Sequence, residues 1–331
     1  MFSDSVYIDR LSRMPTVMEM PYNEIVRKFI DMYAGRLRNQ VAFMLSACNF
    51  YMPIFEEALD AYGLPLELKY LPIIESALNP SAVSRAGACG LWQFMLATGK
   101  IYGLESNSLV DERRDPIKAT WAAARYLKDM YDIYKDWNLV IAAYNCGPGT
   151  INKAIRRSGG KTDYWEIYNY LPKETRGYVP AFIAANYVMT YYCKHNICPM
   201  ETDIPEATDT VQVSRNLHFE QISDLCGISL DQIKSLNPQF KKSIIPERAS
   251  RRRYASPSTT SVPSLTSKTP SMPTAVTSCS RTAESWPFPI HARRHVAAKA
   301  VPLRGMSPTT RYAVARISAA LHGNTASLSI S

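Results

Sequence analysis

The 331-residue sequence lacks any uninterrupted run of about 18 apolar residues, although 46% of its residues are hydrophobic. A helix that crosses a bilayer needs about 20 consecutive apolar residues, so no membrane-spanning segment is predicted. Residues 1–15 also lack the basic start and apolar core of a secretion signal. Length and composition therefore favour a globular chain with one large or two small domains.

Paired zinc ligands are also missing. None of the seven cysteines stands in a CxxC pair with matching histidines, which argues against a structural zinc site. Cys193 and Cys198 could form a small disulfide, but the cysteines are more typical of small core or turn residues.

Acidic residues are scarce in the last quarter of the chain. Residues 247–331 carry 12 Lys and Arg against 2 Asp and Glu, whereas residues 1–246 carry 26 against 27. The net charge of +9 therefore comes from the tail, and the rest of the chain gives no electrostatic indication of nucleic acid binding. The tail is rich in Ser, Thr, Pro, Ala and Arg and is predicted to be disordered. It is either a native disordered tail or an out-of-frame reading of a gene segment.

Alternating strand patterns are absent before residue 205, and helical patterns dominate. We predict helices at residues 23–45, 52–63, 65–79, 86–103, 116–134, 136–145 and 179–195. Residues 1–54 are interpreted as an N-terminal helical region and residues 55–205 as an all-α main domain. In residues 206–246, one strand at 210–214 precedes two short helices. No second strand is predicted after them, so this small βααβ unit is expected to be incomplete.

Glu75 stands in the otherwise apolar run "LPIIESALNP". In a helix, Leu68, Leu71, Glu75 and Leu78 share one face that should be buried. Burial disfavours the charged carboxylate and raises its pKa. A protonated carboxyl group at the wall of a cleft is what a general acid requires. The alternative is a partly exposed helical residue or one half of an ion pair.

Three further motifs follow Glu75 along the chain. "GLWQ" contains Gln93, "AAYNCGPG" presents Tyr144 and Asn145 where an apolar helix stops, and "ETRGYV" contains Glu174 and Tyr178. Together with "ES" at Glu75, they resemble the "ES", "GLMQ", "AYNxG" and "ETxxYV" motifs of the soluble-lytic-transglycosylase domain, which is related to goose-type lysozyme. The similarity covers residues 55–195. Within this family, the stretch most resembles the branch called membrane-bound lytic murein transglycosylase D. Trp92 is a departure from the second motif.

The resemblance implies a lysozyme-like helical fold and cleavage of the β-1,4 bond between N-acetylmuramic acid and N-acetylglucosamine. The product is a 1,6-anhydromuramoyl end, formed without water and without a metal or organic cofactor. Between Ser76 and Leu104 there is no second Asp or Glu, whereas two-carboxylate glycosidases need one. Glu75 would therefore act first as acid and then as base. Residues 208–246 resemble a LysM module, which binds glycans containing N-acetylglucosamine.

The resemblance also assigns the substrate-binding residues. Ser84 and Gln93 would hydrogen-bond the sugar, Met95 would shape the cleft floor, and Tyr144 would position the acid or the sugar. Ser76, Asn145, Glu174 and Tyr178 complete the set. Four of these residues, and Trp92, have a structural alternative: Tyr144 as a packed aromatic, Gln93 as a helix cap, Trp92 and Met95 as core residues, and Glu174 as an acidic first-turn residue.

The implied partner is the peptidoglycan glycan strand, and the implied location is the periplasm or cell envelope, with possible outer-membrane association. The missing signal would then mean that the chain begins downstream of the true start. Three alternatives stay open: a muramidase that uses water, a catalytically silent glycan-binding or scaffold protein, and a transglycosylase of a phage tail or secretion apparatus.

Overall fold

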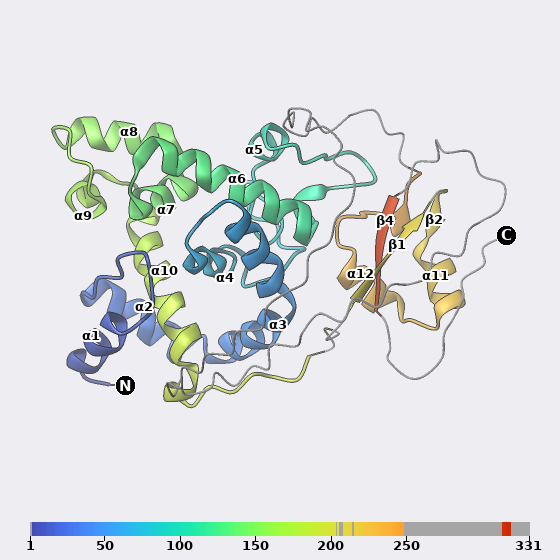
Figure 1. Ribbon diagram of the computed structural model, residues 1–331, viewed down its shortest axis with the longest axis horizontal. Helices are drawn as coiled ribbons and strands as arrows, with labels where there is room; N and C mark the ends of the chain where they lie inside the picture. Colours follow the sequence, from blue (N-terminus) through green and yellow to red (C-terminus); the bar gives the residue numbers. More distant parts are fainter. Residues whose placement is uncertain (1, 203, 205–207, 214, 248–312, 319–331) are drawn as a thin grey trace, which may run out of the picture. The chain divides into compact units, whose positions relative to one another are not determined.

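The computed structural model describes residues 2–202, 204, 208–213, 215–247 and 313–318 (Figure 1). Those residues are mainly helical, as the sequence predicts. The α-helices are α1 Asp4–Ser12, α2 Glu24–Ala34, α3 Arg38–Ala61, α4 Leu71–Ser76, α5 Leu96–Ile101, α6 Pro116–Tyr134, α7 Trp137–Cys146, α8 Pro148–Arg157, α9 Tyr164–Ile167, α10 Lys173–Tyr191, α11 Phe219–Cys226 and α12 Leu230–Leu236. The 3-10 helices are η1 Leu66–Tyr70, η2 Glu112–Arg114, η3 Tyr168–Tyr170 and η4 Tyr192–His195. The strands are β1 Thr208–Val213, β2 Leu217–His218, β3 Ile244–Ile245 and β4 Ala313–Ser318.

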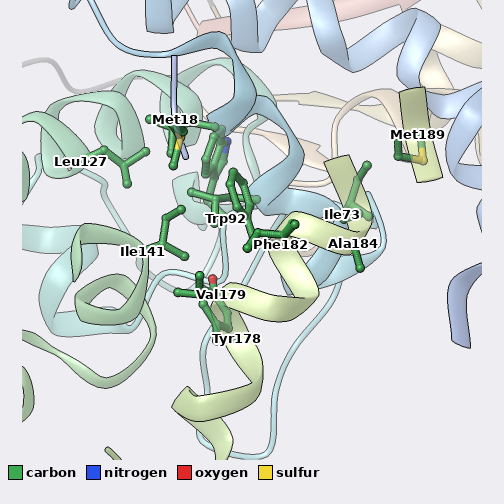
Figure 2. Close-up of a cluster of buried hydrophobic side chains, with 14 of the residues drawn as sticks. Met18, Ile73, Trp92, Leu127, Ile141, Tyr178, Val179, Phe182, Ala184 and Met189 are labelled. Atoms are coloured by element: carbon green, nitrogen blue, oxygen red, sulfur yellow. The ribbon is translucent and has the colours of Figure 1, made fainter. Parts of the chain in front are cut away.

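One hydrophobic core includes side chains from every α-helix from α1 to α10 except α5. It extends from Tyr7 in α1 to Ile197 after η4. Helix α2 packs closely against α10, where the missing side chain of Gly177 leaves room for Phe29. Residues 1–54 therefore share the core of the main domain. Figure 2 shows part of this core, in which Val179 and Phe182 of α10 point toward Trp92.

The first predicted helices begin and end at other residues than expected. The sequence predicts one helix at 23–45 and another at 52–63, but the chain breaks at Gly35 instead. The Asn23 side chain accepts hydrogen bonds from the backbone amides of Ile25 and Val26, which fixes the start of α2. Helix α3 then continues through Pro53 to Ala61, because its buried face is continuous with the core on both sides of the proline.

The segment around Glu75 is shorter and more broken than the predicted helix at 65–79. A 3-10 helix, η1, leads into the six-residue α4, which ends at Ser76. Ala77 and Leu78 follow with φ of 51° and 61°, in the left-handed region that ends a helix. Leu68, Leu71 and Leu78 are buried as predicted.

Of the predicted helix at 86–103, only the last part is helical in the structure. Residues Leu96–Ile101 form α5. The preceding residues form a turn with isolated antiparallel bridges of Val83 to Cys89 and of Cys89 to Phe94. Backbone groups in this turn pair with each other, so no helix is needed to satisfy them.

The unit after residue 206 contains the predicted strand and both predicted helices. Its small core consists of Phe219, Ile222, Ile233 and Ile245. The expectation that no second strand follows is wrong, because β3 pairs antiparallel with β2, with Leu217 opposite Ile245. The predictive signal was weak because β3 has only two residues.

Strand β1 pairs antiparallel with β4, with Thr208 opposite Ser318 and Val213 opposite Ala313. Residues 313–318 therefore differ from the expected disorder of the tail. Residues 248–312 and 319–331, for which disorder or an out-of-frame reading is predicted, lie outside the described residues. In the described part of the chain, every helix is too short or too polar to cross a membrane.

Candidate active site

Glu75 lies near the end of α4, where its half-buried side chain borders a cavity of about 400 Å³. The left-handed residues that stop α4 turn the chain away just after the acid. The cavity is lined by side chains from α2, α3, α4 and the loop that follows: Tyr33, Leu37, Gln40, Met44, Ile73, Ile74, Glu75, Ser76, Ala77, Ala82, Val83, Ser84 and Gln93.

The surroundings of Glu75 favour its protonated form. Burial raises the pKa of Glu75 from its ordinary value of 4.5 to about 7, the hydrogen bond from Tyr178 lowers it, and the charge of Glu174 raises it. No Lys, Arg or His among the described residues forms an ion pair with Glu75. A substantial fraction of Glu75 therefore still carries its proton at neutral pH, as the apolar run around it predicts.

Two tyrosines from different helices surround the acid. The Tyr178 hydroxyl of α10 donates a hydrogen bond to Glu75 Oε1. The Tyr144 hydroxyl of α7 donates to the carbonyl oxygen of Trp92 at 2.7 Å. Burial, followed by the charge of Glu75, raises the pKa of both tyrosines well above 10, so both stay neutral donors. The hydroxyl of Tyr144 is satisfied by the protein, as its packed-aromatic alternative requires.

The loop after α4 is held by short side-chain contacts to its own backbone. The Gln93 amide group donates to the carbonyl oxygens of Gly90 at 2.8 Å and Ala82 at 3.3 Å. Ser84 Oγ accepts from the amide of Ala88 at 3.0 Å. The Ser76 hydroxyl lies 2.9 Å from the carbonyl oxygen of Leu91 and ties α4 to the same loop.

Gln93 has a φ of 46°, which turns the backbone sharply between Trp92 and the start of α5. The residue that precedes α5 as its N-cap is Met95. The alternative in which Gln93 caps the next helix is therefore wrong. Its side chain borders the cavity while it holds the loop.

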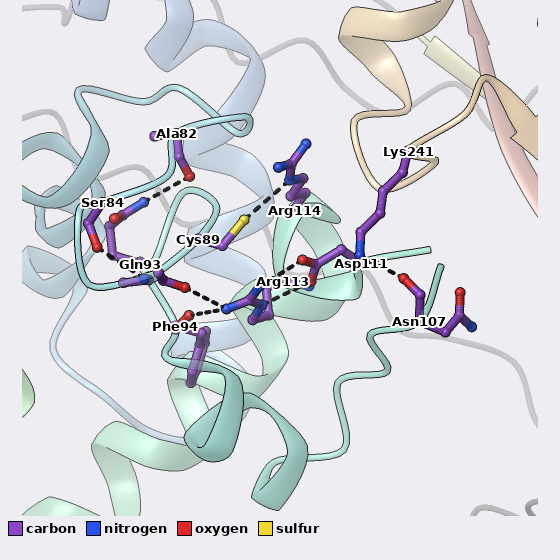
Figure 3. A network of polar contacts seen from close by, with 12 residues as sticks. Ala82, Ser84, Cys89, Gln93, Phe94, Asn107, Asp111, Arg113, Arg114 and Lys241 are labelled. Atoms are coloured by element: carbon purple, nitrogen blue, oxygen red, sulfur yellow. Dashed lines mark hydrogen bonds and ion pairs between the residues drawn. The ribbon is translucent and has the colours of Figure 1, made fainter. Parts of the chain in front are cut away.

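A buried ion pair between Asp111 and Arg113 supports the loop that follows α4 (Figure 3). Arg113 Nη2 lies 2.8 Å from Asp111 Oδ2, and the Arg113 Nη1 donates to the carbonyl oxygens of Gly87 and Phe94 at 2.9 and 3.0 Å. Gly90 lies so close that an added Cβ would be 1.8 Å from the carbonyl oxygen of Arg113. Asp111 and Arg113 were not predicted as part of the site; their only signal in the sequence was the charged run "DERRD" before α6.

The network in Figure 3 has two further connections. Arg114 Nε lies 3.2 Å from the buried Sγ of Cys89, which makes this cysteine part of the support of the loop. On the other side, Lys241 Nζ donates to the carbonyl oxygen of Asn107 at 2.7 Å.

Five of the residues assigned by resemblance do not line the cavity: Met95, Tyr144, Asn145, Glu174 and Tyr178. Met95 is 46% exposed, so its core alternative is wrong. Asn145 Oδ1 accepts a hydrogen bond from Thr175 at 2.9 Å, which connects the end of α7 to the first turn of α10. Glu174 is exposed in that same first turn, close enough to influence Glu75. Trp92, the departure from the motif, is fully buried and donates to Thr120 at 2.9 Å.

The cavity also contains residues that the sequence analysis missed. Tyr33, Leu37, Gln40 and Met44 come from α2, α3 and the turn between them. Their only sequence signal was a helical pattern, which does not show that a buried face also borders a cavity. Among the described residues, no group of three or more His, Cys, Asp or Glu side chains could hold a metal ion.

Comparisons with known proteins match two parts of the chain. Residues 52–167 match the family described as the Transglycosylase SLT domain, and residues 207–254 match the LysM-like domain of lytic transglycosylase MltD. The chain therefore carries both domains, in that order.

Individual relatives are similar to parts of this chain. Membrane-bound lytic murein transglycosylase D of Escherichia coli K12 is 32% identical over 69% of this chain and 51% of its own length. The soluble lytic murein transglycosylase of the same strain is 32% identical over 36% of this chain and 19% of its own length. Among solved structures, the 70 kDa soluble lytic transglycosylase Slt70 from E. coli aligns with 28% identity and a TM-score of 0.38, over 43% of this chain and 24% of that one. The chain spans about half the length of its relative MltD.

Proposed function

We propose that this chain, which carries the catalytic domain type of the lytic murein transglycosylases, cleaves the β-1,4 bond between N-acetylmuramic acid and N-acetylglucosamine in peptidoglycan. The product is a 1,6-anhydromuramoyl end. The observation that carries the proposal is Glu75, a carboxyl group with a pKa of about 7 and the only acidic side chain among the described residues that line the cavity.

The proposed reaction uses this one carboxyl group twice. The protonated Glu75 donates its proton to the glycosidic oxygen, and the bond from that oxygen to C1 of the muramic acid breaks. The substrate's own N-acetyl group stabilises the positive charge at C1. The Glu75 carboxylate then takes the proton of the C6 hydroxyl, whose oxygen bonds to C1. Glu75 ends the cycle protonated, and no water is consumed.

The surrounding residues would position the acid and the sugar. Tyr178 fixes the orientation of the Glu75 carboxyl group through its hydrogen bond. Tyr144, through the Trp92 carbonyl, holds the backbone that leads to Gln93. Ser84 and Gln93 border the cavity and would hydrogen-bond the sugar. Met95, Asn145 and Glu174 would contribute outside the cavity.

The product distinguishes this reaction from hydrolysis by a muramidase. Mass spectrometry of muropeptides released from purified sacculi should detect 1,6-anhydro ends and no reducing muramic acid ends. Reducing ends would indicate attack by water instead, with Glu174 as the nearby acidic group to examine. A catalytically silent scaffold would release neither product.

The LysM-like unit would bind N-acetylglucosamine along the same type of glycan. Peptidoglycan lies outside the cytoplasmic membrane, so the place of action would be the periplasm or cell envelope. Fractionation of cells that express the native gene, followed by immunodetection, tests this location. Recovery only in the cytoplasm would contradict it.

A further inference from the structure

Part of the cavity wall at Glu75 comes from outside the matched catalytic domain. That domain begins at residue 52, whereas Tyr33, Leu37, Gln40 and Met44 belong to α2, α3 and the turn between them. Met44 is buried, Leu37 is half-buried and Gln40 is exposed. This part of the wall is therefore apolar inside and polar at its rim.

Tyr33 is the unusual member of this wall. Its side chain belongs to the buried face of α2, beside Val26 and Ile30, and it is only 7% exposed. Among the residues that the structure describes, its hydroxyl group has no hydrogen-bond partner, although the residue borders the cavity. The hydroxyl oxygen is also not among the fully buried side-chain atoms that lack a partner in the described residues, so it is open to the cavity, where a ligand can accept its hydrogen bond.

The hydroxyl group of Tyr33 is a neutral donor close to the acid. Burial raises its pKa to about 12, so it keeps its proton at any physiological pH. Tyr33 also contributes to the raised pKa of Tyr178, which places it near the hydroxyl group that donates to Glu75. A group that binds Tyr33 would therefore lie beside Glu75.

We infer that Tyr33 binds the N-acetyl group of a sugar in this cavity, and that the N-terminal helices therefore supply a specificity-determining wall of the site. The amide carbonyl oxygen of the acetyl group would accept the Tyr33 hydrogen bond. Its methyl group would lie against Leu37 and Met44, where the wall is apolar. The inference rests on the proposed function only in taking an N-acetylated glycan as the ligand.

The test compares two soluble probes, N-acetylglucosamine tetramer and its fully de-N-acetylated counterpart, in which free, positively charged amines replace the acetamides; each probe is compared between variant and unmodified protein, so the charge difference cancels. Their affinities are measured by calorimetry for the full-length protein and for Tyr33→Phe, which removes one oxygen and keeps the ring packed in α2. The data are fitted with separate sites for the cavity and for the LysM-like unit, and only the cavity site should change. The variant should bind the acetylated tetramer about three- to tenfold more weakly, the usual effect of one lost neutral hydrogen bond. Its affinity for the de-N-acetylated tetramer should change less than twofold.

Tyr62→Phe is the matched control, because the Tyr62 ring packs against Trp121 and does not border the cavity. It should bind both probes like the unmodified protein. If Tyr33→Phe does not fold, as judged by thermal unfolding, Leu37→Ser tests the methyl contact with the same two probes. Equal loss for both probes, or no loss, would overturn the inference. The absence of anhydro products from sacculi would instead contradict the proposed function and leave this comparison of affinities valid.

Discussion

The helical domain and the LysM-like unit differ in the size of the hydrophobic core on which each is built. The helical domain has one core to which every α-helix from α1 to α10 except α5 contributes, and it holds the half-buried Glu75 against that core. The LysM-like unit rests on Phe219, Ile222, Ile233 and Ile245, and its strand β1 pairs with residues far along the chain. A large core can tolerate the cost of an acid with a displaced pKa, whereas a core of four side chains has little stability to lose.

The largest effect should come from the acid itself. Glu75→Gln keeps the size of the side chain but cannot transfer a proton, so cleavage of sacculi should fall by about 10²- to 10⁴-fold. The release of anhydromuropeptides measures this loss. Retention of more than a few per cent of the activity would contradict the single-acid mechanism.

The same variant has a predicted effect on stability. The folded-state pKa of Glu75 is about 7, above its ordinary 4.5, so protonation stabilises the fold below pH 4.5 and this contribution is lost as the pH rises through 7. Glu75→Gln should therefore match the unmodified protein at pH 4. At pH 8 it should be more stable, by at most about 3 kcal/mol. Urea unfolding at the two pH values measures the difference, and equal stability at both would show that the fold does not hold Glu75 with a raised pKa.

The next prediction compares the two cores by replacing one buried phenylalanine with alanine in each. Phe182 in α10 and Phe219 in α11 are both fully buried. Replacing either with Ala should cost about 3–5 kcal/mol. In the helical domain this lowers the unfolding temperature of a domain that still folds. In the LysM-like unit the same cost should exceed the free energy of unfolding, so Phe219→Ala should unfold this unit while the helical domain stays folded.

Hydrogen exchange of each variant, read by mass spectrometry, locates the loss of structure. In Phe219→Ala, amides of residues 217–245 should exchange rapidly while those of α10 stay protected. Loss of protection in α10 of this variant would mean that the two regions unfold as one.

Smaller and opposite effects are expected from the two neighbours that shift the pKa of Glu75. The cleavage rate should fall at alkaline pH, along the alkaline limb of its pH profile, as Glu75 loses its proton. Tyr178→Phe removes a hydrogen bond that lowers this pKa, so the fall in rate should move to higher pH. Glu174→Gln removes a charge that raises it, so the limb should move to lower pH. Profiles of the cleavage rate from pH 5 to 9 measure both shifts. If the alkaline limb moves in the same direction in both variants, the causes assigned to the pKa shift of Glu75 are wrong.

The smallest effect should come from the tail. Removing residues 248–331 takes away β4, the partner of β1, but leaves the cavity and its supporting network unchanged. Cleavage by the helical domain should therefore stay within a factor of about two. Salt-sensitive adhesion to anionic surfaces should decrease, because the removed segment is strongly basic. A pronounced loss of cleavage would show that the tail supports the helical domain.

Local patterns in the sequence were sufficient for helices α6 and α7 and for the raised pKa of Glu75. Helices α6 and α7 agree closely with their predicted ranges, because each has a start signal and a continuous apolar face. The raised pKa of Glu75 followed from its apolar neighbours alone. The break at Gly35 and the short α4 were not predicted, because apolar periodicity continues across both.

The sequence by itself predicted Glu75 as the acid, showed which motifs accompany it, and determined that the first 200 residues are mainly helical, since these depend on residue type and short spacing. Only the tertiary structure decided that Tyr33 of α2 borders the same cavity as Gln93, and that Arg113 supports the loop that carries Gln93. It also decided which distant segment completes each small sheet. The physical reason is that packing brings together surfaces separated by tens to hundreds of residues, and no local pattern records which of them will meet.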